Sequence, residues 1–214
     1  MEAATTKNKI SIPEAYIEYC LSGTHTQNVY QFCKFAKISE KEFYEDYGSL
    51  RAVKYAIYKQ PLDEALEMLH ADENFKQYGT HEKVLSLYFT WVQQLTNIRS
   101  FLLYQEDQCG LKFYKDFYYS FHEDFKEFTE GVISEGIGKG EIPSRQYIDQ
   151  FYSKGLWAQL MFIFKYWLHD TSKGFERTDA AIEKSAKVAF DMIGEGPLDS
   201  IFDLGRFMMG NIRS

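Results

Sequence analysis

The chain has 214 residues, and its 31 acidic and 24 basic side chains give a formal net charge of −7. This length can bury a sizeable core in one or two domains, and four prolines with no strand-like alternation favour helices. The three cysteines are scattered without metal-ligand or redox spacing, and free thiols suit a reducing cytosol. No secretory signal is visible, and the most apolar stretch, residues 156–168, is too short to span a membrane. We therefore expect a cytoplasmic protein with no membrane partner.

Two short helices are predicted near the N-terminus. Apolar residues recur at i, i+3, i+4 and i+7 from Val29 to Ala36, which predicts a helix with one apolar stripe. Ser39 and Glu42 have the spacing of a capping box, so a second, very short helix should begin there. A third helix opens at Ser49. Two short helices around a tight turn are typical of a helix-turn-helix, whose second helix enters the major groove of DNA.

Further residues of this segment fit one register. They are Gly23 at the end of a first helix, Gln27 and Val29 in the second, Ile38 and Ser39 at the turn, Phe43, Tyr44 and Tyr47 in the third, and Ser49 at the next cap. In this register, residues 12–57 resemble the DNA-binding domain of TetR-type transcriptional regulators. The resemblance implies an all-α fold, with an N-terminal three-helix helix-turn-helix domain at residues 1–58. A helical ligand-binding and dimerisation domain would follow at residues 59–214.

The resemblance also implies that double-stranded DNA is a partner. Lys41 is the basic residue best placed to reach a base edge, and Gln27, Ser39 and Tyr44 suit contacts with phosphates. A glutamate such as Glu42 can accept a hydrogen bond from cytosine in the major groove. These five residues form the predicted DNA-binding set.

The charge of the same helix opposes this prediction. Glu40, Glu42, Glu45 and Asp46 lie within seven positions, and DNA phosphates repel carboxylates. Much of the repulsion would disappear if Glu42 folded back onto the cap and Glu45 paired with Lys41 one turn earlier. The alternative is a helical subdomain that is kept only for packing.

Beyond residue 58 the sequence predicts helices joined by short polar breaks. Pro61 either kinks or ends the helix that opens at Ser49. Glycines between Gly131 and Gly140 are expected to loosen the chain after a helix of residues 112–133. The other predicted helices begin at Thr80 or cover residues 101–105, 144–170, 178–193 and 197–209.

Two of these helices suggest an interface between two copies of the chain. Residues 156–168 are apolar nearly all round, so this helix should be covered on several sides. In TetR-like proteins such a helix and the next one pack against their twofold mates as a four-helix bundle, so the resemblance implies a homodimer. The alternative is that both helices only close the core of one chain. The predicted interface residues are Leu156, Leu160, Phe164, Ile182, Ala186 and Phe190.

The interior is unusually aromatic, with 18 Phe, 16 Tyr and 3 Trp in the chain. In a TetR-like protein the middle helices hold an effector pocket, and an aromatic cavity suits a small hydrophobic or aromatic ligand. The alternative is that aromatic residues at helical spacing are ordinary core. The predicted pocket residues are Tyr88, Trp91, Phe113, Phe117, Phe121 and Trp157.

Nothing in the sequence predicts a catalytic residue, a metal site or a cofactor. The five histidines are isolated, and the glycines near residue 138 do not form a phosphate-binding loop. We expect a dimeric, ligand-responsive transcriptional repressor rather than an enzyme, in which a ligand changes the spacing of two DNA-reading heads. The alternative is a TetR-fold protein that has lost DNA binding and acts as a hydrophobic-ligand or protein-interaction module.

Overall fold

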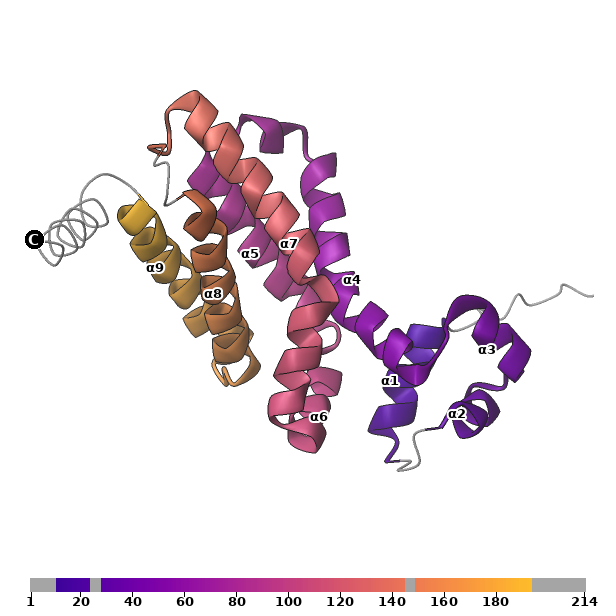
Figure 1. The fold of residues 1–214 in the computed structure, drawn as a ribbon. Coiled ribbons are helices and arrows are strands. Elements are labelled where there is room, and N and C mark those ends of the chain that lie inside the picture. The colour runs from indigo at the N-terminus through magenta and orange to yellow at the C-terminus, as the bar shows by residue number, and fades with distance from the viewer. Residues whose placement is uncertain (1–10, 24–27, 145–148, 194–214) are drawn as a thin grey trace, which may run out of the picture. The chain divides into compact units, whose positions relative to one another are not determined.

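The computed structural model describes residues 11–23, 28–144 and 149–193, and within these ranges the chain forms helices and no strand (Figure 1). The all-α prediction is thus confirmed. None of the described helices is both long and apolar enough to cross a membrane. The α-helices are α1 (Ile12–Leu21), α2 (Val29–Ala36), α3 (Glu40–Asp46), α4 (Leu50–Ala71), α5 (Thr80–Thr96), α6 (Arg99–Cys109), α7 (Leu111–Lys139), α8 (Asp149–Leu168) and α9 (Glu176–Ile193). Two short 3₁₀ helices, η1 (Glu73–Gln77) and η2 (Lys173–Phe175), precede α5 and α9.

Local capping explains where the first helices begin. Ser11 and Glu14 form a capping box on α1, and the Asn28 side chain accepts a hydrogen bond from Gln31 N at the start of α2. The capping box predicted at Ser39 and Glu42 is confirmed at the start of α3. The predicted last helix at residues 197–209 lies outside the described residues.

Helices continue past both expected breaks, so the helix end predicted at residue 133 is wrong and, of the two alternatives at Pro61, the helix end does not occur. Pro61 lies inside α4, which runs unbroken to Ala71. The helix predicted for residues 112–133 continues as α7 to Lys139, through Gly131, Gly136 and Gly138. Glycine costs a helix interior up to about 1 kcal/mol relative to alanine, which tertiary packing readily offsets. Gly136 is buried beside Thr80, so this glycine serves close packing rather than a break.

The chain divides into two compact units. Unit 1 holds residues 1–61 and 95–121, and unit 2 holds residues 62–94 and 122–214. Helices α4 and α7 each contribute to both units. Unit 1 therefore contains more than the helix-turn-helix segment, because α6 and the first turns of α7 belong to it.

An aromatic core holds unit 1 together. Helix α1 packs against α2 and α6, and α2 packs against α3. The rings of Tyr16, Phe32 and Phe43 are buried, with centroids 5.8 Å apart for both Tyr16–Phe32 and Phe32–Phe43. The ring centroids of Tyr58 on α4 and Phe117 on α7 lie 5.4 Å apart. Phe43 thus fixes which face of α3 points inward.

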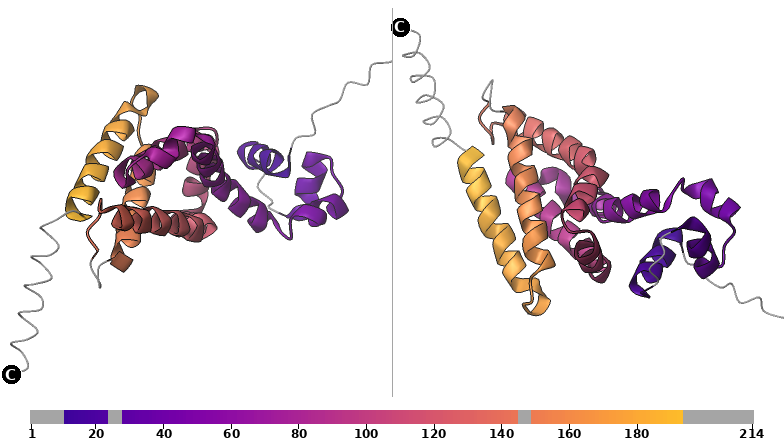
Figure 2. Two further views of the ribbon diagram at one scale, coloured as in Figure 1. Left: turned by 90° about the horizontal axis from the view of Figure 1, so that it is seen from above. Right: turned by 60° about the horizontal axis from the view of Figure 1, so that its bottom comes forward.

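Unit 2 is built on the second parts of α4 and α7, on α5 up to residue 94, and on α8 and α9. Helices α8 and α9 pack side by side (Figures 1 and 2). Tyr88 of α5 donates hydrogen bonds to the Leu156 carbonyl at 3.0 Å and to Gln159 Oε1 at 3.2 Å, which ties α5 to α8. Lys83, buried on α5, forms an ion pair of 2.6 Å with Glu135 of α7.

Candidate functional site

The helix-turn-helix of unit 1 has a tight turn between α2 and α3. Lys37 ends α2 with φ 56° and ψ 40°, the left-handed conformation that glycine adopts most easily. Ile38 N then donates to the Cys33 carbonyl at 3.0 Å. This turn leads directly into the Ser39 cap of α3. We call α1, α2 and α3 the reading head.

Two of the predicted DNA-binding residues are engaged in capping α3. Ser39 N and Ser39 Oγ donate to Glu42 Oε2 at 2.8 and 3.0 Å, and Glu42 N donates to Ser39 Oγ at 3.1 Å. The Glu42 carboxylate therefore folds back on the cap. Within the described part of the chain, Glu45 forms no ion pair with Lys41. Of the two contacts that would reduce the repulsion between α3 and DNA phosphates, the structure thus contains the one made by Glu42.

The exposed surface of α3 carries one lysine, one exposed tyrosine and four carboxylates. Lys41 and Tyr44 are three residues apart on α3, and Tyr44 is 52% exposed; Glu45 lies one turn after Lys41, and exposed Glu40 lies one turn before Tyr44. Glu42, Glu45 and Asp46 line a groove of about 1090 Å³ against α1. Lys41 and Tyr44 are not among the residues that line this groove. Most of the acidic side chains of α3 therefore gather on the side that faces α1.

The rest of that groove is lined by both apolar and charged side chains. Glu18 of α1 adds a fourth carboxylate, and Lys37 is the cation among the lining residues. Ser11 and Tyr47 also line the groove, together with the apolar residues Ile12, Pro13, Ala15, Phe35, Ala36 and Ile38. We call this surface the acidic groove. The fifth predicted DNA-binding residue, Gln27, lies outside the described residues.

The six predicted pocket residues are divided between the two units. Phe113, Phe117 and Phe121 belong to unit 1, whereas the other three belong to unit 2. In unit 1 the rings of Phe117 and Phe121 are buried, with centroids 4.9 Å apart. All three phenylalanines are buried.

The three pocket residues of unit 2 lie on α5 and α8. Tyr88 and Trp91 are fully buried, and Trp157 is half-buried. The Trp157 ring lies 4.8 Å from the His122 ring and 5.4 Å from the Phe125 ring, measured between centroids. Burial raises the pKa of the Tyr88 hydroxyl well above its ordinary value, so this group remains a neutral donor.

The predicted interface residues of α8 and α9 mostly face the core of their own chain. Leu156, Leu160, Phe164, Ile182 and Ala186 are at most 1% exposed, and Phe190 is half-buried. At least five of the six predicted interface residues are therefore packed inside unit 2.

The outward face of the same two helices is also apolar. Phe162 and Tyr166 of α8 are exposed one turn apart, as are Val188 and Met192 of α9. All four line a groove of about 1060 Å³ along α8 and α9. We call these four residues the apolar face. The sequence held a signal for this surface, because residues 156–168 are apolar nearly all round.

No group of side chains suited to hold a metal ion occurs among the described residues. His122, which has acidic neighbours in the sequence, places its Nδ1 atom 3.0 Å from Glu123 Oε1. The buried polar cluster of unit 1 around Asp116 was not predicted from the sequence.

A family model described as "Tetracyclin repressor-like, C-terminal domain" matches residues 83–208, which is more than half of the chain. No curated protein matches the sequence. The matched range covers α5 to α9 and starts after the helix-turn-helix segment, so it bears on the helical domain that follows the reading head.

Proposed function

Because this chain belongs to the tetracyclin repressor-like (TetR-type) family, we propose that it is a dimeric, ligand-responsive transcriptional repressor that binds operator DNA. The observation that supports DNA binding most directly is the exposure of Lys41 and Tyr44 on α3. Neither residue lines the acidic groove, where Glu42, Glu45 and Asp46 lie, and exposed Glu40 is one turn before Tyr44. The residues proposed to contact DNA are Lys41, Tyr44, Ser39, Glu42 and Gln27.

The proposed contacts differ in chemistry. Lys41 would donate to a base edge, which confers sequence preference, and the Tyr44 hydroxyl would bind a phosphate, which confers affinity for any sequence. Ser39 and Glu42 would serve mainly by fixing the start of α3, since each is bonded to the other. A protein that acts on DNA in this way would work in the cytoplasm.

The proposed dimer forms through the apolar face rather than through the buried residues of α8 and α9. Exposed apolar residues at i and i+4 on two neighbouring helices form a contiguous surface, and such surfaces are characteristic of protein interfaces. Twofold packing of this face would make a four-helix bundle. It would present two copies of α3 to half-sites about one DNA turn apart.

The proposed ligand is small and hydrophobic or aromatic, and would bind in unit 2 near Tyr88, Trp91 and Trp157. Binding would lower DNA affinity if the ligand-bound dimer held the two reading heads at a different spacing. Neither a cofactor nor a catalytic residue has a part in this proposal.

One observation favours a second function. The acidic groove combines apolar side chains with four carboxylates, and this combination suits a basic protein segment better than DNA. In this alternative the protein keeps the TetR fold but has lost DNA binding, and serves as a protein-interaction or hydrophobic-ligand module.

Retention of DNA by the purified protein distinguishes the two functions. A sequence-specific repressor should retain a palindromic site from genomic fragments, with an affinity that falls steeply as salt rises. A folded dimer that retains no DNA at low salt would support the interaction module instead.

A further inference from the structure

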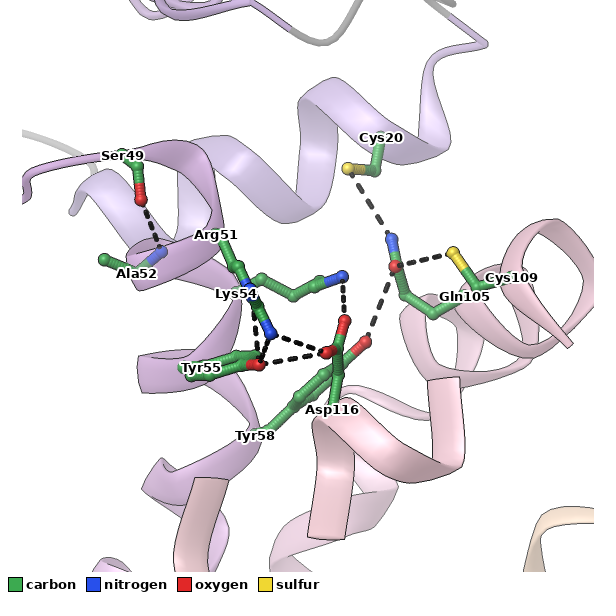
Figure 3. A network of polar contacts seen from close by, with 10 residues as sticks. All are labelled: Cys20, Ser49, Arg51, Ala52, Lys54, Tyr55, Tyr58, Gln105, Cys109 and Asp116. Carbon is green, nitrogen blue, oxygen red and sulfur yellow. Dashed lines mark hydrogen bonds and ion pairs between the residues drawn. The ribbon is translucent and has the colours of Figure 1, made fainter. Parts of the chain in front are cut away.

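Asp116 of α7 is a buried carboxylate that binds three side chains of α4. It is 2% exposed, and it accepts hydrogen bonds from Lys54 Nζ at 3.0 Å, Tyr55 Oη at 2.9 Å and Arg51 Nη2 at 3.2 Å (Figure 3). Arg51 also donates to the Tyr55 hydroxyl. The three donors lie at i, i+3 and i+4, so they share one face of α4. We call Asp116 and these donors the Asp116 clamp.

The clamp compensates a charge that would otherwise be costly to bury. Burial alone would raise the pKa of the Asp116 carboxyl, but hydrogen bonds from Lys54 and Tyr55 and the charges of Lys54 and Arg51 outweigh it. The pKa is lowered overall, so the carboxylate is charged. The Lys54 side chain is only 12% exposed, so loss of Asp116 would leave a nearly buried ammonium without its partner.

A second set of polar contacts extends the connection to other helices of unit 1. Tyr58, one turn after Tyr55, donates to Gln105 Oε1 of α6 at 3.4 Å. The amide of Gln105 also contacts Cys20 Sγ of α1 at 3.9 Å and Cys109 Sγ at 4.0 Å (Figure 3). Gln105 is buried, and polar groups inside a core tolerate few arrangements. Directional contacts thus join α1, α4, α6 and α7.

The position of the clamp in the chain suggests its role. Helix α4 begins four residues after α3 ends, and its first two turns carry the donors. Helix α7 begins in unit 1 and continues without a break into residues 122–139 of unit 2. A displacement along α7 would therefore reach Asp116 through a continuous helix, and would reach α4 through three bonds.

We infer that Asp116 is a positioning residue that couples the first turns of α7 to the reading head, so that α7 controls the affinity of the head for DNA. This inference rests on the proposed repressor function and names the element that regulates it. Coupling between two sites is reciprocal. DNA bound at α3 must then stabilise residues 99–121, although the proposed DNA contacts lie elsewhere.

Hydrogen exchange of the full-length protein, with and without DNA, tests the inference. The DNA probe is the genomic fragment that the wild-type protein retains at low salt. Asp116→Asn removes the carboxylate charge, and Asp107→Asn is the matched control, because Asp107 is an exposed carboxylate on α6. Lys54→Met combined with Asp116→Leu replaces the ion pair by apolar groups, which often restores stability.

DNA should slow amide exchange in residues 99–121 of the wild type and of Asp107→Asn by at least about fivefold, the lower end of typical coupling between sites. Asp116→Asn and the double variant should bind the same DNA but lose this protection. The double variant should also regain thermal stability. If Asp116 had a purely structural role, restored stability would bring the protection back as well. Undiminished protection in either Asp116 variant would overturn the inference.

A wild-type protein that retains no DNA would refute the repressor function, and the same variants would still test the clamp. In DNA-free protein, Asp116→Asn should accelerate exchange in residues 50–58 and in α3 by about tenfold or more, as expected when a local element opens more readily. Exchange in α5 residues 80–94 of unit 2 should not change. Unchanged exchange in both α4 and α3 would overturn the coupling claim.

Discussion

Replacing glycines of α7 by alanine should give opposite effects at two positions of one helix. Alanine is favoured over glycine in a helix interior by up to about 1 kcal/mol. At Gly131 a Cβ atom would meet nothing within 4 Å, so Gly131→Ala should stabilise the protein by about 0.5–1 kcal/mol. At Gly136 the added Cβ would lie 2.2 Å from Thr80 Oγ1 and 3.2 Å from Ile142 Cδ1.

Thr80 cannot move away from Gly136 without losing other contacts. Its backbone N and its Oγ1 both donate to Glu141 Oε2, at 2.6 and 2.9 Å, and the residue is buried. Overpacking of this kind costs about 1–3 kcal/mol, which exceeds the gain in helix propensity. Gly136→Ala should therefore destabilise the protein by about 1–2 kcal/mol.

Urea unfolding at one protein concentration measures both effects, because unfolding of a dimer depends on concentration. In a Thr80→Ala background, which lacks the Oγ1 atom, the cost of Gly136→Ala should shrink, and a double-mutant cycle gives the coupling. The reasoning would be refuted if Gly136→Ala stabilised the protein as much as Gly131→Ala does.

Three further predictions concern DNA binding, dimerisation and pH. Lys41→Ala should weaken operator binding about tenfold in filter binding and relax its sequence preference, whereas Tyr44→Ala should weaken binding to all sequences alike. Unchanged affinity in both variants would exclude Lys41 and Tyr44 as DNA contacts. Val188→Glu places a charge on the apolar face and should yield monomers in sedimentation, and a persistent dimer would move the interface elsewhere. Burial would raise the pKa of Asp170, but hydrogen bonds from Ser172 and Thr178 lower it to about 2. Because the folded pKa lies below the unfolded value, Asp170→Asn should cost about 1–2 kcal/mol at pH 7 and progressively less as pH falls from about 4 towards 2; an equal cost at pH 7 and pH 2.5 in urea unfolding would contradict this assignment.

Features set by local interactions could be predicted from the sequence. The Ser39–Glu42 capping box depends on residues three apart, and it is present in the structure as predicted. The inward position of Phe43 follows from helix periodicity. The extent of α7 could not be predicted in this way, because Gly136 is accommodated by Thr80, which is distant in sequence.

The sequence also does not determine which face of an apolar helix points inward. Residues 156–168 are apolar nearly all round, so the pattern indicates several covered faces without saying which one points inward. In the structure Leu160 and Phe164 face the core, and Phe162 and Tyr166 face outward. Partners such as Asp116 and Arg51, 65 residues apart, leave no local pattern at all.

Selection of DNA from the protein's own genome tests the central claim most directly. Purified protein is mixed with fragmented genomic DNA at low salt, and the retained fragments are sequenced. The repressor function predicts enrichment of a palindromic site with half-sites about one helical turn apart, and loss of that enrichment in Lys41→Ala. No enrichment by a folded, dimeric protein would contradict DNA reading and would favour a partner for the acidic groove.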